Sequence, residues 1–145
     1  MANTLYDNAR KMWAEGNIAW GGDDQFNCCL VNANYTFGAT HIYASEINPA
    51  TGGPRDYGVT AGAGKPMAGL AVATNGAIYA ENVRFETVAA DRPPVTAIVI
   101  YRFGTEQTDS PLIYYANVAT GLPITPNGGD IIVTWSLGTN RILRL

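Results

Sequence analysis

Residues 95–135 read VTAIVIYRFGTEQTDSPLIYYANVATGLPITPNGGDIIVTW. Three apolar runs in this stretch, at 95–103, 112–118 and 131–135, are rich in Val, Ile, Tyr and Trp. The segments between them are rich in Gly, Pro, Asn and Asp. Short β-branched and aromatic runs bounded by turn-forming residues are typical of β-strands. The stretch therefore predicts an antiparallel meander around which the rest of the chain is organised.

The run at 95–103 is apolar on both of its faces. Val95 and Val99 lie on one face of an extended chain, and Ile98 and Ile100 lie on the other. A strand with one side in water would alternate between apolar and polar residues. Two-sided apolarity predicts either a central strand covered on both sides or an outer face covered by another subunit.

A short helix is expected near the N-terminus, where apolar residues recur at three- and four-residue spacing at Leu5, Ala9, Met12 and Trp13. This spacing predicts an amphipathic helix over 4–15. Thr4 or Asn3 would cap its start, and Gly16 would end it. We treat 1–16 as an N-terminal helical segment.

The remaining sequence predicts further short strands and no second domain. They are expected at 17–20, 26–32, 65–73, 77–88 and 141–145, with a single helical turn at 41–47. Irregular short strands separated by turn residues indicate a β-sandwich. The chain is therefore predicted to form one mainly β domain over 1–145, an antiparallel β-sandwich with one short N-terminal helix. A partly open barrel is the alternative.

The segment 48–65 is the longest one without a periodic pattern, and it holds five of the sixteen glycines. Loops of this length are usually functional or ordered by a partner, although a mobile surface loop is the alternative. Its centre carries a charge pair and an aromatic residue, types enriched at interface hot spots. The short helix also needs something to cover its apolar face. The residues predicted to bind a partner are Met12, Trp13, Arg55, Asp56 and Tyr57.

The composition points to assembly and away from nucleic acid and membranes. Charged residues make up 14% of the chain, against about 25% in typical domains, and interface cores are depleted of charge. This favours a homo-oligomer over a monomer with a neutral polar surface. The net charge is −3, and the chain lacks the basic stripe that nucleic-acid binding requires. No run approaches the ~18 apolar residues of a membrane span.

The sequence predicts no catalytic site, no metal and no cofactor. The neighbours Cys28 and Cys29 point to opposite faces of a strand, so we expect two reduced thiols, one buried and one partly exposed. Two cysteines and the single His41 cannot supply the four ligands of a zinc site. We expect His41 to be structural. Acidic residues in glycine-bearing turns, such as Asp130, are explained by turn chemistry.

Four segments carry a family resemblance: LYDNARKMWAEGNIAW at 5–20, AIVIY at 97–101, SPLI at 110–113 and ATGLPITPNGGDIIVTW at 119–135. They resemble a group of small virion proteins of tailed bacteriophages. The middle of the chain, about 34–75, departs from that pattern, as does the turn that begins with Ser136. The resemblance implies a structural component of the particle, and it carries over no catalytic or binding residue.

The function that follows from the resemblance is that of a capsid decoration or cement protein, made in the host cytoplasm and placed on the virion exterior. Its partners would be the major capsid protein and copies of itself, in a trimer, because threefold positions are common in capsid lattices. The alternative is a neck, collar or tail component that binds a host-surface glycan. A glycan hydrolase would need paired carboxylates, and the twelve acidic residues do not cluster in the sequence.

Overall fold

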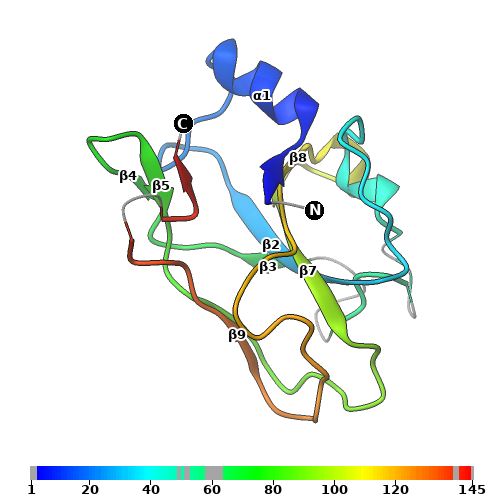
Figure 1. Cartoon of the computed structure of the whole chain (residues 1–145). Helices are drawn as coiled ribbons and strands as arrows, with labels where there is room; N and C mark the ends of the chain where they lie inside the picture. The colour runs from blue at the N-terminus through cyan, green and yellow to red at the C-terminus, as the bar shows by residue number, and fades with distance from the viewer. Residues whose placement is uncertain (1–2, 49, 51–52, 58–63, 139–140, 145) are drawn as a thin grey trace.

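A computed structural model describes residues 3–48, 50, 53–57, 64–138 and 141–144. It confirms a mainly β fold with one α-helix near the N-terminus and antiparallel sheets in a sandwich-like arrangement (Figure 1). The largest sheet has five strands in the order β1 (Thr4–Leu5), β8 (Leu112–Ala116), β7 (Val95–Arg102), β2 (Phe26–Asn32) and β3 (Lys65–Pro66).

Two smaller sheets accompany the large one. Three strands pair in the order β10 (Leu143–Arg144), β5 (Ala77–Tyr79) and β4 (Ala71–Val72), and two strands pair as β6 (Val83–Phe85) and β9 (Ile131–Val133). Buried residues of all three sheets belong to one hydrophobic cluster. The small sheets therefore help to complete the core that the large sheet begins.

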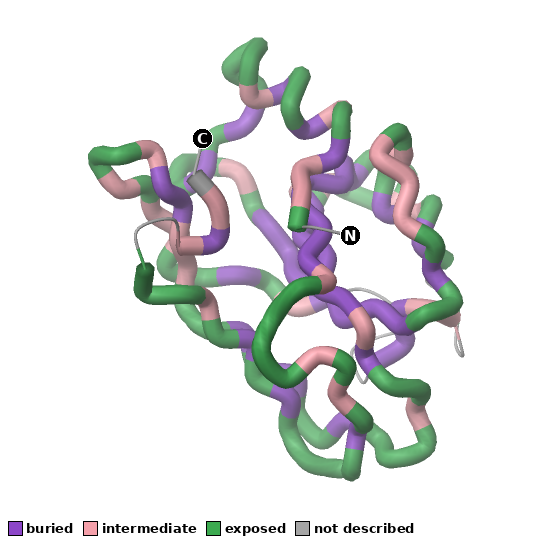
Figure 2. The backbone as a smooth tube through the Cα atoms, in the orientation of Figure 1, coloured by how far each residue is buried: buried purple, intermediate pink, exposed green. Residues whose placement is uncertain are grey.

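The three central strands explain the two-sided apolar pattern. Every residue of β2 and β8 is buried, and so are all residues of β7 except its second and last (Figure 2). β7 lies between β2 and β8, so its neighbours in the sheet satisfy its backbone and other parts of this chain cover both of its faces. The alternative that a second subunit covers this strand is not needed.

One face of the large sheet is covered by the N-terminal segment and by the loop that follows β2. The ring of Phe37 stacks on Tyr115 of β8 at 4.6 Å between centroids, and Tyr6 packs against Phe37 at 5.2 Å. Tyr6, which is fully buried, immediately precedes helix α1 (Asp7–Ala14). The helical segment is thus part of the core of the domain.

The helix is shorter than predicted, because its expected first turn is a strand. Thr4 and Leu5 form β1 and pair with Tyr115 and Tyr114. The expectation that Asn3 or Thr4 caps the helix is wrong, since the N-cap residue is Tyr6 and no side chain caps it. Side-chain atoms of Asn3 instead bind the backbone of residues 117 and 118. The helix ends at Ala14, one residue before the predicted end, and Gly16, which follows the C-cap residue Glu15, has a φ of 75°.

Other predicted elements are divided or replaced. The segment at 17–20 is irregular, because its polar backbone groups are used elsewhere: the Ala19 N–H donates to Asp24, and the Asn17 carbonyl accepts from Arg102. The predicted strands at 65–73 and 77–88 are each divided into two short strands that belong to different sheets.

The turn predicted at 41–47 is a 3₁₀-helix, η1 (Ala44–Glu46), and it begins after Tyr43. The Glu46 carboxylate accepts hydrogen bonds from the N–H groups of Ile42 and Tyr43, which fixes that start. A second 3₁₀-helix, η3 (Gln107–Asp109), lies between β7 and β8.

Cys28 and Cys29 are free thiols, as predicted. Both are buried, with 0% and 2% of their surface exposed. The expectation that one of them is partly exposed is wrong, because both faces of β2 are covered. Burial and the neighbouring Cys29 raise the pKa of Cys28. Burial likewise raises the pKa of Cys29 to about 11, although the nearby Arg55 guanidinium opposes the rise.

Candidate interaction cleft

The loop residues predicted to anchor a partner are buried inside the chain. Arg55, Asp56 and Tyr57 expose only 2%, 7% and 2% of their surface. Arg55 donates to the Ile47 carbonyl at 2.9 Å and to Gln107 Oε1 at 2.6 Å. These contacts join the loop to η3. These three side chains are therefore used for packing within the chain, and their role in binding a partner stays a prediction.

The neighbouring side chains of this loop confirm that it is tied to the domain. The Asp56 carboxylate lies 3.2 Å from the Arg92 guanidinium, and the Tyr57 hydroxyl donates to the Pro93 carbonyl at 2.7 Å. Residues that are typical of interface hot spots have thus been used for internal packing. Positions 49, 51–52 and 58–63 of the predicted 48–65 loop lie outside the described residues.

The helical residues predicted to meet a partner also pack against this chain. Met12 is buried in the core cluster, and Trp13 is half-buried against it. Asn8 donates to the Met12 sulfur at 3.4 Å from one turn before it. The apolar face of the helix is therefore covered by the domain itself. The apolar residues of the helix do not require a partner to cover them.

The single histidine takes part in a structural network. The Tyr35 hydroxyl lies 2.9 Å from His41 Nδ1 and 2.9 Å from the hydroxyl of the buried Tyr6. Burial raises the pKa of Tyr6 far above its usual value, and its neighbour Tyr35 raises it further. A buried tyrosine that keeps its proton links the N-terminal segment to the loop after β2. The expectation that His41 has a structural role agrees with this geometry.

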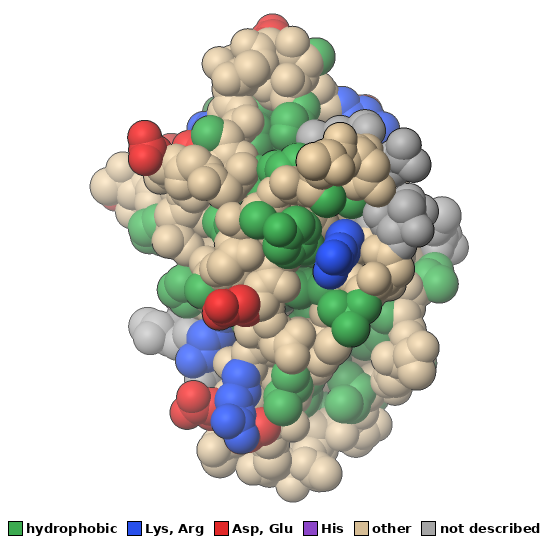
Figure 3. Space-filling view, turned by 90° about the vertical axis from the view of Figure 1, so that its left-hand side faces the viewer, with side chains coloured by type: hydrophobic (Ala, Val, Ile, Leu, Met, Phe, Trp, Pro, Cys, Tyr) green, Lys and Arg blue, Asp and Glu red, His purple; other side chains and the backbone are tan. Residues whose placement is uncertain are grey.

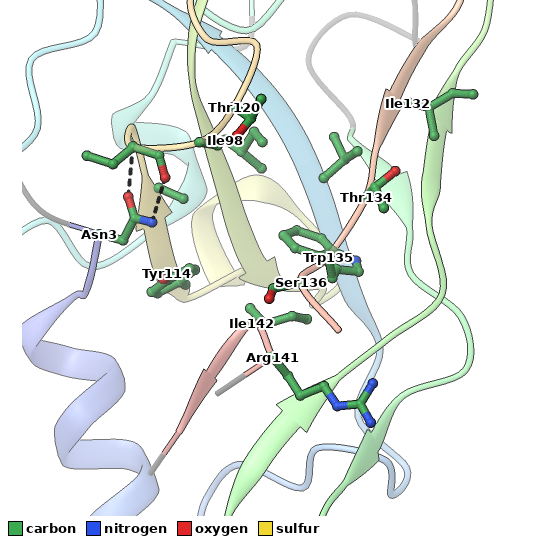
Figure 4. A pocket seen from close by; sticks show the side chains of 14 residues that line it. Asn3, Ile98, Tyr114, Thr120, Ile132, Thr134, Trp135, Ser136, Arg141 and Ile142 are labelled. Atoms are coloured by element: carbon green, nitrogen blue, oxygen red, sulfur yellow. Dashed lines mark hydrogen bonds between the residues drawn. The ribbon is translucent and has the colours of Figure 1, made fainter. Parts of the chain in front are cut away.

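A hollow of about 490 Å³ lies beside β9. Side chains from β7, β8, β9 and residues 141–142 line it (Figure 4). Its lining includes Ile98 and Tyr114 from the large sheet and Trp135, which follows β9. A smaller hollow of about 100 Å³ continues it along β9 towards residues 119–124. We call these two hollows together the cleft.

Two walls of the cleft expose large apolar side chains. Val118, just beyond β8, is 62% exposed, and Ile132 of β9 is 53% exposed. Leu137, which follows the β9 wall, is 86% exposed. Apolar side chains also gather around a basic side chain on the flank of the molecule that Figure 3 shows. Neighbouring exposed apolar side chains beside a hollow are typical of binding surfaces.

The wall formed by residues 116–120 is held in place by the N-terminus. Asn3 Nδ2 donates to the Val118 carbonyl at 3.0 Å. Asn3 Oδ1 accepts from the N–H groups of Asn117 at 3.0 Å and Val118 at 2.9 Å (Figure 4). One side chain thus satisfies three backbone groups after β8. The geometry gives the cleft one wall that is fixed before any ligand arrives.

The described lining of the cleft includes one basic residue and no acidic one, whereas the whole chain has a net charge of −3. Among its described lining residues the only charged one is Arg141, whose guanidinium lies 4.8 Å from the centre of the Tyr79 ring. An adjoining hollow beside Asn3 contains Arg10, again without an acidic lining residue. The cleft is therefore suited to a partner that carries negative charge.

Comparison with protein-family models and with curated proteins found no match for this sequence. Across the described parts of the chain, no cluster of three or more His, Cys, Asp or Glu side chains has the arrangement of a metal site. None of the helices described has the length and apolarity needed to cross a bilayer.

Proposed function

We propose that this protein is a structural protein of a bacteriophage virion, a decoration protein that binds outside the capsid shell through the cleft and its apolar walls. The observation that supports the proposal is that one segment carries both the family resemblance and the candidate binding surface. The segment at 119–135, which resembles small virion proteins, supplies β9 and much of the cleft lining. The resemblance and the candidate interaction surface therefore fall on the same residues.

The mechanism of such a protein is stabilisation by binding. A protein that binds the assembled shell and not its separated subunits shifts the equilibrium towards the shell by mass action. Contact across neighbouring subunits requires exposed apolar area and no reacting group. Val118 and Ile132 supply such area at the two walls of the cleft. We therefore propose a binding role and no enzymatic one.

The test uses virus particles that lack the protein. Ile132→Lys places a charge on a side chain that is 53% exposed, and Phe103→Lys makes the same change at a 43% exposed site away from the cleft. Both variants are expected to fold as stably as the wild type. Ile132→Lys is expected to reduce the bound copies about tenfold, and Phe103→Lys to leave them unchanged. Equal binding of all three proteins, or no binding by the wild type, would contradict the proposal.

Self-association is proposed with less structural support than the capsid contact. The two-sided apolar strands no longer argue for it, because this chain covers them itself. The low share of charged residues, 14%, still favours a homo-oligomer, and a trimer is proposed from the symmetry of capsid lattices. Light scattering of the purified protein at micromolar concentration tests it, and a monomer would remove this part of the proposal.

A second candidate function is the binding of a host-surface glycan by a neck, collar or tail component. The observation that favours it is the placement of the half-buried Trp135 on the cleft wall beside the hydroxyl groups of Thr134 and Ser136. Aromatic rings and hydroxyls together suit sugar rings. Saturable quenching of tryptophan fluorescence by a host glycan, lost in Trp135→Leu, would support this function over the first.

A further inference from the structure

We infer that the outer edge of β9 binds an extended, acidic segment of a partner polypeptide, which adds to β9 as a third strand inside the cleft. This inference deepens the proposed function, on which its biological setting rests, by naming the kind of partner segment and the way it binds. Four features of β9 and its surroundings support it: an unpaired edge, the orientation of that edge, the space beside it and the charge around it.

The outer edge of β9 is unpaired. β9 pairs with β6 alone, through the registers Val83 to Val133 and Phe85 to Ile131. Among the described residues, no backbone hydrogen bond joins the other edge of β9 to another segment. Unpaired N–H and C=O groups along a strand are a template for an added strand. A two-stranded ribbon is also marginal in stability, and a third strand would reinforce it.

The unpaired edge of β9 points towards the cleft. Ile132 and Val133, consecutive residues of β9, both line the cleft, and so do residues 134–136 just after the strand. In an extended chain, consecutive side chains point to opposite faces. A sheet face turned towards the cleft would therefore contribute only one of Ile132 and Val133. Because both contribute, the backbone edge of β9 borders the cleft, which is the orientation that strand addition needs.

The cleft has room for an added strand. A strand in a packed sheet occupies about 3.3 Å along its length per residue, about 4.8 Å to the next strand and about 10 Å between layers. The product is on the order of 160 Å³ per residue. The main hollow of about 490 Å³ therefore accommodates about three residues of added strand, which is comparable to the length of β9.

The charged residues around the cleft are basic. Arg141 is a lining residue of the main hollow, and Arg10 is a lining residue of the adjoining one. No described lining residue of these hollows is Asp or Glu. The charged lining residues near an added strand are therefore arginines, which attract carboxylates and repel lysines. Electrostatic complementarity of this kind determines partner choice more than affinity, so we assign the acidic strand as the occupant.

The test uses a capped hexapeptide, Thr-Val-Glu-Val-Glu-Val, as the probe and the full chain as the receptor. Amide hydrogen exchange, followed residue by residue by NMR, is expected to slow within 131–135 when the peptide binds. The same peptide with its alternate backbone nitrogens methylated is the matched control, because it keeps the side chains and loses the edge hydrogen bonds. It is expected to give no protection.

Charge is tested separately from strand addition. Replacing both glutamates of the probe by lysine is expected to weaken binding about fivefold or more, given the usual strength of exposed ion pairs. Arg141→Gln is expected to weaken binding of the acidic probe by about threefold. Lys11→Gln, on the helix and 68% exposed in its side chain, is the control and is expected to have no effect.

The outcomes distinguish strand addition at β9 from glycan binding in the cleft and from the proposed function. No exchange protection in β9 with the acidic probe overturns the inference, and equal binding of the acidic and lysine probes overturns its charge argument. Fluorescence change at Trp135 with a glycan, but no protection with the peptide, assigns the cleft to sugar binding instead. A protein that joins the particle without protection of β9 keeps the proposed function and rejects this inference. Protection of β9 without binding to the particle keeps this inference and rejects the proposed function.

Discussion

The hydroxyl groups of Tyr6 and Tyr35 lie 2.9 Å apart in the interior, although 29 residues separate them in the sequence. The pair joins the segment before the helix to the loop after β2. Removing one hydroxyl leaves the other without this partner in a buried place, which usually costs about 1 kcal/mol. Tyr6→Phe is therefore expected to lower the free energy of unfolding by about 1 kcal/mol in urea titrations. Tyr43→Phe, at a site that is 41% exposed, is the control and is expected to change little.

Arg55 is expected to matter for folding and not for a partner. Arg55→Ala leaves the Ile47 carbonyl and Gln107 without their buried donor. The expected loss is about 2–3 kcal/mol in the free energy of unfolding, as is usual for an uncompensated buried group. Lys11→Ala, which removes a 68% exposed side chain from the helix, is expected to cost less than about 0.5 kcal/mol. Equal costs for the two changes would contradict the buried role of Arg55.

The thiols make stability depend on pH above 9. Burial raises the pKa of Cys29 from the usual 9.0 to about 11, so the unfolded thiol loses its proton first as the pH rises. The unfolded state then binds fewer protons than the folded one, and stability falls. The contribution is complete below pH 9 and is lost as the pH rises towards 11.

The measurement is a series of urea titrations between pH 8 and pH 10. Each such thiol is expected to account for a loss of about 1 kcal/mol between pH 9 and pH 10. Buried tyrosines such as Tyr101, with a pKa raised by burial, add to the loss at higher pH. Cys29→Ala removes the contribution of one thiol, and the free energy of unfolding is expected to fall less steeply as the pH rises. A profile that is the same with and without Cys29 would contradict the prediction.

Thr87 offers a stabilising substitution. Its φ of 48° places a β-branched residue in the left-handed region, which costs on the order of 1–2 kcal/mol. Its N–H donates to Asp130 at 2.9 Å, and glycine keeps that bond. Thr87→Gly is expected to raise the free energy of unfolding by about 0.5–1 kcal/mol, after the entropy that glycine loses on folding. Thr36→Gly, without a positive φ to relieve, is expected to lower it, and destabilisation by both changes would argue against strain at Thr87.

The sequence predicted those parts of the fold that depend on local pattern. β2 was predicted at 26–32 to the residue, because an apolar run bounded by turns leaves little freedom in its limits. Within the strand predicted at 77–88, β6 alternates as an extended chain does, with Val83 and Phe85 buried and Arg84 exposed. The division of 65–73 and 77–88 was missed, because it depends on which sheet each half joins.

The cleft was missed for a related reason. Its lining comes from Asn3, Ile98, Trp135 and Arg141, which are far apart in the sequence and show no common pattern. The resemblance at 119–135 was the one signal that pointed to its wall. The partner prediction at Arg55 did not foresee the burial of this residue, because hot-spot residue types are also the types that form buried networks. The residue types alone do not show whether such side chains are buried or exposed.

The N-terminal segment gives the sharpest contrast between the two levels of inference. Its short amphipathic helix led to the prediction that Met12 and Trp13 bind a partner. In the structure, β1 pairs with β8, and Tyr6 and Ala9 are fully buried. Deletion of residues 1–15 would remove the edge strand and uncover Tyr115 beneath it. The deleted chain is therefore expected to lose cooperative unfolding, and not only its binding to particles.

A point substitution keeps this prediction testable if the deleted chain cannot be purified. Ala9→Glu places a carboxylate in a fully buried site on the inner face of the helix and is expected to lower the free energy of unfolding by about 3 kcal/mol or more. Ala14→Glu, on the exposed end of the same helix, is the matched control and is expected to cost less than about 0.5 kcal/mol. Circular dichroism and urea titration measure both. If the deletion variant and Ala9→Glu both unfold like the wild type, the helix is an appendage after all, and its apolar face becomes a candidate surface for the capsid.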